Sequence, residues 1–101
     1  MLMITLGVMT TTAQRIEGRP VGEYFGVVTA DSVVVIPSLT ALSPARSIGG
    51  ALFRGQRDVI DGIARQANAR GATAVVDVSV VYIPIGPGHV IVSAAGTAVR
   101  L

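Results

Sequence analysis

The fold depends above all on one stretch of sequence, Ala74-Val75-Val76-Asp77-Val78-Ser79-Val80-Val81-Tyr82-Ile83. Most of its residues are β-branched or aromatic, and alternate positions fall on opposite faces of an extended chain, which is typical of a β-strand. Turn-forming residues follow at 84–88, and a second strand-forming run extends from His89 to Leu101. We therefore predict a β-hairpin with its turn at residues 84–88.

Both faces of this hairpin are rich in apolar residues. A plain hairpin about residues 84–88 places Tyr82 opposite Val90. Val80 then lies opposite Val92, on an apolar face that also contains Val76 and that a helix could cover. The second face carries Asp77 among further apolar residues. We predict that its apolar members contact a neighbouring subunit, and they are Val75, Val81, Ile83, Ile91, Ala95 and Val99.

Upstream of the hairpin, apolar residues recur at spacings of three and four, which predicts an amphipathic α-helix. The stripe consists of Leu52, Phe53, Gln56, Val59, Ile60, Ile63, Ala64 and Ala67. Ser43-Pro44 is typical of a helix start, but Gly49-Gly50 interrupts the pattern, so we expect the main helix to begin after it. Gly71 stands at a C-cap position. Gly55 and Gly62 weaken the helix, which therefore needs tertiary support.

Residues before the helix predict further strands. Residues 24–29 and 32–36 are β-branched and apolar, and they indicate two strands or one bent strand. The apolar start, residues 1–9, indicates an N-terminal strand or a mis-assigned start codon. It is too short to span a bilayer and lacks the basic region of a signal peptide. The predicted fold class is therefore a single α+β domain over residues 1–101, a two-layer β-α-β-β subunit with an antiparallel sheet and one main helix.

The composition favours a protein that associates with itself. A chain of 101 residues buries only about two thirds of the surface that its unfolded form exposes. Half of the residues are hydrophobic and 14% are charged, against roughly 25% charged in a typical soluble domain. The charged residues are too few to coat an isolated domain, so we predict a closed homo-oligomer.

Several classes of function are disfavoured. The net charge is only +2, and no basic cluster with stacking aromatics indicates nucleic-acid binding. There is no cysteine, which removes thiolate chemistry and fits a cytoplasmic location. His89 is four strand residues from Ser93, about 13 Å, too far for a nucleophile and its base. We predict no enzyme activity, no catalytic residues, no cofactor and no membrane partner.

Two residues are weak ligand candidates. Asp77 interrupts a valine-rich strand and needs a polar partner if it is buried. A structural bond to Ser93, Thr97 or an Arg of a neighbouring subunit is the ordinary interpretation. His89 is the chain's one histidine. Copies of either residue could meet around a symmetry axis, which is the route to a metal or anion site that the sequence leaves open.

The chain resembles the YbjQ-like family, small bacterial proteins that carry a heavy-metal-binding label. The resemblance begins at Thr10 and rests on Thr11-Thr12, Glu17-Gly18-Arg19-Pro20, Glu23-Tyr24, Gly26-Val27-Val28-Thr29, Gly49-Gly50, Gly71-Ala72-Thr73-Ala74-Val75-Val76 and Val92-Ser93-Ala94-Ala95-Gly96-Thr97-Ala98-Val99. It implies a dodecin-like β-α-β-β subunit assembled into a pentameric ring, with no established enzyme activity. The predicted helix is about two turns shorter than the resemblance implies. Two interpretations stay open: a non-enzymatic oligomer, or a binder of a small ligand, metal or anion at subunit interfaces or on the ring axis.

Overall fold

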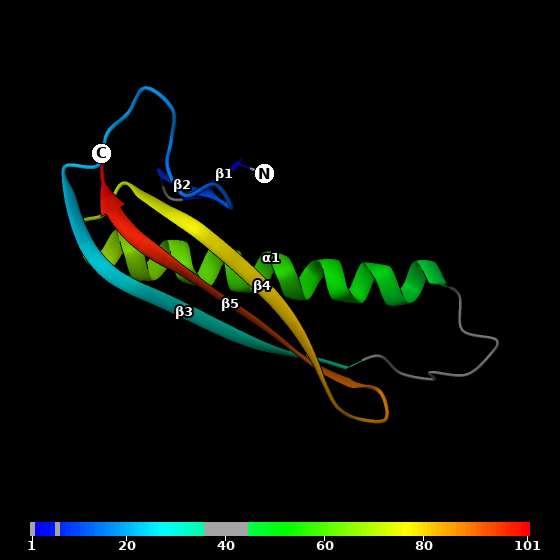
Figure 1. Cartoon of the computed structure of the whole chain (residues 1–101). Helices are drawn as coiled ribbons and strands as arrows, with labels where there is room; N and C mark the ends of the chain where they lie inside the picture. The colour runs from blue at the N-terminus through cyan, green and yellow to red at the C-terminus, as the bar shows by residue number, and fades with distance from the viewer. Residues whose placement is uncertain (1, 6, 36–44) are drawn as a thin grey trace.

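The computed structural model describes residues 2–5, 7–35 and 45–101, and it confirms the predicted α+β class. Its elements are β1 (Leu2–Thr5), β2 (Val8–Thr11), β3 (Glu23–Val35), α1 (Ala45–Ala69), β4 (Ala74–Gly86) and β5 (His89–Arg100). One sheet contains the five strands in the order β1-β2-β4-β5-β3, and α1 runs along it (Figure 1). The pairing is antiparallel except between β2 and β4, which are parallel at Met9↔Ala74 and Thr10↔Val75.

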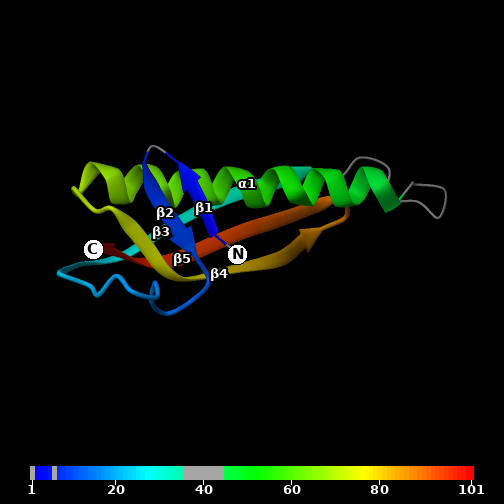
Figure 2. The ribbon, with the colours of Figure 1, turned by 90° about the horizontal axis from the view of Figure 1, so that it is seen from above.

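The N-terminal run forms two short strands. β1 and β2 form an antiparallel hairpin, and this hairpin joins the sheet at the start of β4. Figure 2 shows both strands beside the half of α1 that ends at Ala69. The two apolar runs between residues 24 and 36, by contrast, lie in one continuous strand as far as Val35, with a bulge at Phe25.

Helix α1 is longer than predicted. It begins at Ala45 and passes through Gly49-Gly50, so the predicted interruption is wrong. A glycine costs a helix only about 1 kcal/mol relative to alanine, which packing against the sheet can offset. Ser43 and Pro44 lie outside the described residues. Over the described residues, no helix has the length and apolar content that crossing a membrane requires.

The C-terminal end of α1 follows the prediction. Gly71 has a φ of 83°, and its N–H donates to the Asn68 carbonyl at 3.0 Å. The Ala72 N–H donates to the Ala67 carbonyl at 3.0 Å. These two bonds form a Schellman motif, which satisfies carbonyls that a helix end leaves unpaired.

The predicted stripe of α1 packs on the sheet, with one exception. Val59, Ile60, Ile63, Ala64 and Ala67 are buried against β3, β4 and β5. Phe53 was predicted on the stripe but is 63% exposed.

Two glycines let α1 approach the sheet closely. A Cβ on Gly62 would lie 2.9 Å from the Ala30 Cβ. One on Gly55 would lie 3.0 Å from the Val92 Cγ2 and nearer still to the Val34 Cγ2. Gly55 and Gly62 are therefore sites of helix–sheet contact and do more than weaken the helix.

The hairpin of β4 and β5 has a different register from the predicted one. Its turn is only Pro87-Gly88, with Gly86 opposite His89 and a bulge at Ile85, so Tyr82 lies opposite Val92 and not Val90. The shift is two residues. Because side chains alternate with a period of two, each residue beyond the bulge at Asp77 keeps its predicted face.

Candidate functional site

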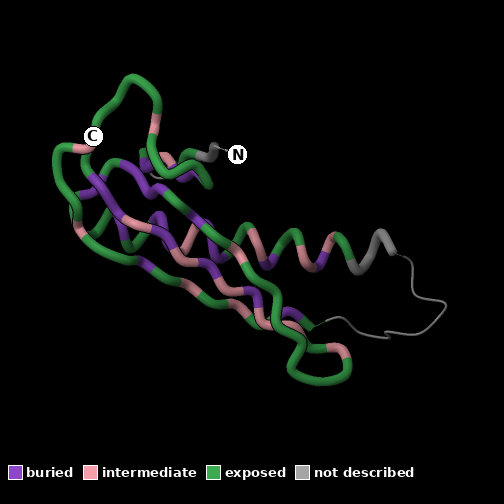
Figure 3. Tube along the Cα trace, viewed as in Figure 1, coloured by how far each residue is buried: buried purple, intermediate pink, exposed green. Residues whose placement is uncertain are grey.

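The sheet has one covered face and one largely bare face. Helix α1 covers the first, and Figure 3 shows that burial falls toward the β4–β5 turn. On the second face, Val33 of β3 lies opposite Ile91 of β5, which lies opposite Ile83 of β4. Beside this row, Asp31 lies opposite Ser93, which lies opposite Val81. We call the apolar patch on this face the open patch; its residues are Val33, Val35, Val81, Ile83 and Ile91.

Most of the open patch is exposed to solvent. Val33 and Val35 are 58% and 57% exposed, and Val81 and Ile83 are 50% and 46% exposed. Ile91, in the middle strand, is partly buried by its neighbours. A contiguous group of exposed aliphatic side chains is the usual mark of an interaction surface, whereas scattered exposed residues carry no such meaning.

A β-bulge divides the second face. Val76 lies opposite Thr97 and Ser79 opposite Ala95, so Asp77 and Val78 share a single partner position. Asp77 adopts a φ of 55°, a left-handed conformation that aspartate tolerates better than most residues. Its N–H donates to the Ala13 carbonyl at 2.8 Å, which attaches the β2–β3 connection to the sheet.

The bulge corrects the predicted faces at the start of β4. Because it inserts one residue, Val75 belongs to the helix face and is fully buried there, and Val76 belongs to the second face. Val99 is on the second face as predicted, but it is fully buried with Val76 against Ile16 and Val21 of the β2–β3 connection. Val75 and Val99 are thus unavailable to a neighbouring subunit.

The other interface candidates remain accessible. Val81, Ile83 and Ile91 belong to the open patch, and Ala95 is partly exposed beside it. Sequence reasoning missed the contribution of Val33 and Val35. It recognised their strand, but nothing in the local pattern showed that this strand pairs with β5.

A polar depression of about 220 Å³ lies between the bulge and the open patch. It is lined by Val27, Asp77, Ser79, Ala95, Gly96 and Thr97. Asp77 is exposed, so its carboxylate is not a buried group that requires a structural partner. Three of its lining residues, Asp77, Ser79 and Thr97, carry side-chain oxygens.

His89 lies at the far end of the second face, opposite Val35. It is exposed, and its Nδ1 lies 3.0 Å from the Pro87 carbonyl. The structure thus places Asp77 and His89 at opposite ends of the open patch and does not bring them together within one protomer.

A larger hollow, of about 520 Å³, borders the β2–β3 connection. Arg15, Ile16, Glu17, Gly18, Arg19 and Pro20 line it. The Arg19 N–H donates to the Ile16 carbonyl at 3.2 Å, which closes a turn over residues 16–19. The lining comes from one short segment whose side chains, apart from that of Ile16, are exposed, so no second element holds them in position.

Comparison with known proteins gives a consistent family. A family model described as "Putative heavy-metal-binding" matches residues 8–101. A UPF0145 protein of Caulobacter vibrioides is 35% identical over 104 residues, which cover 92% of this chain and 99% of that protein. UPF0145 proteins of Pseudomonas putida and Geobacillus kaustophilus are 32% and 29% identical and are covered over 98% and 97% of their lengths.

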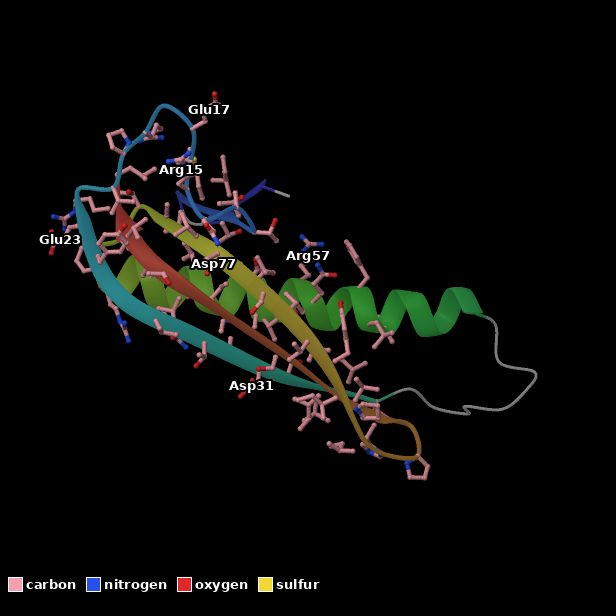
Figure 4. The ribbon with its side chains drawn as sticks, viewed as in Figure 1. Arg15, Glu17, Glu23, Asp31, Arg57 and Asp77 are labelled. Carbon is pink, nitrogen blue, oxygen red and sulfur yellow. The ribbon has the colours of Figure 1, made fainter. Side chains whose placement is uncertain are left out.

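The residues of one protomer do not fit a heavy-metal site. Soft metal ions bind thiolate and imidazole groups, and this sequence has no cysteine and one histidine. Across residues 2–5, 7–35 and 45–101, no three His, Cys, Asp or Glu side chains gather as a metal site requires. Figure 4 shows Glu17, Glu23, Asp31 and Asp77 standing apart from one another.

Proposed function

This chain belongs to the YbjQ-like family of UPF0145 proteins, and on that premise we propose that it is a non-enzymatic subunit of a cytoplasmic homo-oligomer. The proposed assembly is a pentameric ring, the form that the family resemblance implies. In it, neighbouring copies cover the open patch. The single observation that carries the proposal is that patch: Val33, Ile83 and Ile91 lie in one cross-strand row with no covering element among the described residues.

The balance of free energy favours burial of the patch. Removing apolar surface from water contributes roughly 25 cal/mol per Å². Association also costs several kcal/mol of translational and rotational freedom, so a stable contact needs a patch of several neighbouring residues. The open patch meets that need, and it lies on the side of the sheet away from α1, where a second copy has access.

The proposal that the protein is not an enzyme rests on the positions of its candidate acid–base side chains. The chain has one imidazole, His89, and its recorded hydrogen bond is to the Pro87 backbone. A general base must lie within hydrogen-bond reach of the group it activates. Asp77 and His89 lie at opposite ends of the second face, so they cannot act as a pair within one protomer.

Sedimentation velocity at micromolar concentration tests the assembly. We expect a species five times the 10.3 kDa protomer mass. Ile91→Asp places a charge in the patch and is expected to give 10.3 kDa protomers. Ile4→Asp is the matched control, because Ile4 is 67% exposed on β1, outside the patch, and this variant should stay assembled. A parent protein that sediments as a protomer refutes the proposal, and an assembled Ile91→Asp variant refutes the role of the patch.

A second candidate function is the binding of a small cation or other small ligand at the polar depression. Its supporting observation is that Asp77, Ser79 and Thr97 line one depression next to the patch that assembly would cover. Calorimetric titration of the assembled protein with Mg²⁺, Ca²⁺ and inorganic phosphate tests it. Binding that Asp77→Asn abolishes would support it, and heats equal to those of dilution would refute it for these ligands.

A further inference from the structure

The sheet has two open edges, and both lie at the same end. Within the described residues, β3 is the last strand on one side of the sheet. On the other side, β2 pairs with β4 at Ala74 and Val75, and the Asp77 N–H donates to the Ala13 carbonyl, so within the described residues β4 beyond Asp77 has a neighbour on one side only. An open strand edge presents unpaired N–H and C=O groups and is a template for another strand.

Two side chains, one on α1 and one just after its end, close the first half of the β3 edge. The Gln66 side-chain amide donates from Nε2 to the Thr29 carbonyl at 2.6 Å and accepts from the Thr29 N–H at 3.4 Å, as a neighbouring strand would. Arg70, the first residue after α1, donates to the carbonyls of Phe25 and Val27 at 3.1 and 3.3 Å. Strand addition is therefore blocked from Phe25 to Thr29 and is left open at Asp31–Val35.

The blocked stretches of the two sheet edges lie at the same end of the sheet, and so do the open stretches. Thr29 of β3 and Ser79 of β4 both lie opposite Ala95 of β5, so they are at the same level along the strands. The Gln66 and Arg70 contacts therefore occupy the same end of the sheet as the β1–β2 hairpin, which occupies the β4 edge. Asp31 and Val33 lie at the levels of Val81 and Ile83. Both edges are thus open over the same levels, next to the open patch.

Strand alternation identifies the free backbone groups. Because both backbone groups of Thr29 point away from β5, those of Val33 do so too. In β5, the residues whose backbone groups point toward β3 alternate with those whose groups point toward β4. The backbone groups of Val80, Tyr82 and Pro84 in β4 therefore point away from β5. Pro84 has no N–H, and it is tolerated in β4 because its nitrogen faces the open side. The pairing groups on this edge are therefore those of Val80 and Tyr82, with only a carbonyl at Pro84.

We propose that the β3 edge at Asp31–Val35 of one copy pairs with the β4 edge at Val80–Tyr82 of the next copy, in parallel. This inference rests on the proposed homo-oligomer and specifies its contact. The two edges differ, so the contact is heterologous, and repeating it by rotation closes a ring. The strands are parallel because β3 and β4 are each antiparallel to β5 and rotation about the ring axis preserves their direction.

The pairing also explains the position of the open patch. A continued sheet places the row Val33–Ile91–Ile83 of one copy beside the same row of the next copy. Side chains of the two rows that meet at the paired edges cover one another, and this lateral burial contributes hydrophobic stabilisation, while the edge pairing fixes the register between copies.

Amide hydrogen exchange with single-residue resolution tests the pairing. We expect the N–H groups of Val33 and Tyr82 to exchange at least about tenfold more slowly in the assembled parent than in dissociated Ile91→Asp protein. The N–H groups of Ser32 and Val34 are internal controls, because they point toward β5 of the same chain. An assembled protein with fast exchange at both Val33 and Tyr82 overturns the pairing but leaves the homo-oligomer standing. Slow exchange at Val33 alone also overturns it and indicates β3–β3 contact.

A backbone substitution provides a second, independent readout. Val33→Pro removes the outward N–H but no bond to β5, so we expect the far-UV circular dichroism of the parent and dissociation into protomers. Val33→Ala keeps the N–H and is expected to stay assembled at micromolar concentration. An assembled Val33→Pro variant contradicts the pairing. If the parent protein is itself a protomer in solution, the proposed homo-oligomer is refuted. That result is distinct from an assembled parent that lacks the edge pairing.

Discussion

Replacing Gly55 with alanine tests how closely α1 lies on the sheet. In an exposed helix, glycine to alanine stabilises by roughly 0.5–1 kcal/mol. At Gly55 the added Cβ would lie 3.0 Å from the Val92 Cγ2, with the Val34 Cγ2 nearer still. Val92 is fully buried and Val34 is 8% exposed, and neither short, branched side chain has room to turn away.

The expected outcome is a net loss of stability. Overpacking a core by one methyl group costs typically about 1–3 kcal/mol, which exceeds the gain in helix propensity. We therefore expect Gly55→Ala to lower the free energy of unfolding by about 1–2 kcal/mol. Gly49→Ala is the matched control, because a Cβ there meets nothing within 4 Å. It should raise the free energy of unfolding by roughly 0.5–1 kcal/mol.

Urea unfolding of the three proteins at one protomer concentration provides the measurement. A constant concentration is needed because association contributes to apparent stability. The cost of Gly55→Ala should be smaller in a Val34→Ala background, by at least about 0.5 kcal/mol, because that background removes the nearest methyl group. If Gly55→Ala stabilises the protein as much as Gly49→Ala does, α1 does not lie this close to the sheet.

Three further predictions can be checked by the same unfolding assay. Asp77→Val should lower the free energy of unfolding by about 1–2 kcal/mol, because a β-branched residue is strained at a φ of 55°. Asp77→Gly should stay within about 0.5 kcal/mol of the parent. Equal effects of the two substitutions would contradict the left-handed conformation at the bulge. Gly96→Ala should destabilise by about 1–3 kcal/mol because its Cβ would lie 2.6 Å from the Val75 Cγ1; a neutral result would contradict that approach. Glu23→Gln should cost under about 1 kcal/mol and lose its effect in 1 M NaCl, because the 3.0 Å ion pair with Arg100 is half exposed; a larger, salt-independent loss would contradict this.

In the proposed homo-oligomer, the open patch contributes apolar side-chain contacts and the proposed edge pairing contributes backbone hydrogen bonds. The open patch has no directionality, so by itself it would accept several relative positions of two copies. The edge groups at Val33 and Tyr82 accept a strand in few registers. Gln66 and Arg70 narrow the choice further, because they occupy the rest of the β3 edge. Together these features favour one geometry of assembly.

The sequence alone determined the type of each main element. Alternation from Ala74 to Ile83, spacings of three and four from Leu52 to Ala67, and Gly71 after Arg70 are local patterns, and local backbone geometry follows from them. The prediction that one helix leaves part of a two-sided apolar hairpin uncovered also followed from these patterns. It holds for Val81, Ile83 and Ile91.

Tertiary structure decided what depends on residues distant in sequence. The bulge at Asp77 moved Val75 into the helix core, and the β2–β3 connection buried Val99. The pairing of β3 with β5 added Val33 to the open patch. From the sequence, Gly55 only weakens a helix. The structure shows that Val34 and Val92 pack against it, so the absence of a side chain there permits close helix–sheet contact. In each case the residue types are unchanged and only their neighbours in space differ, which a one-dimensional pattern does not record.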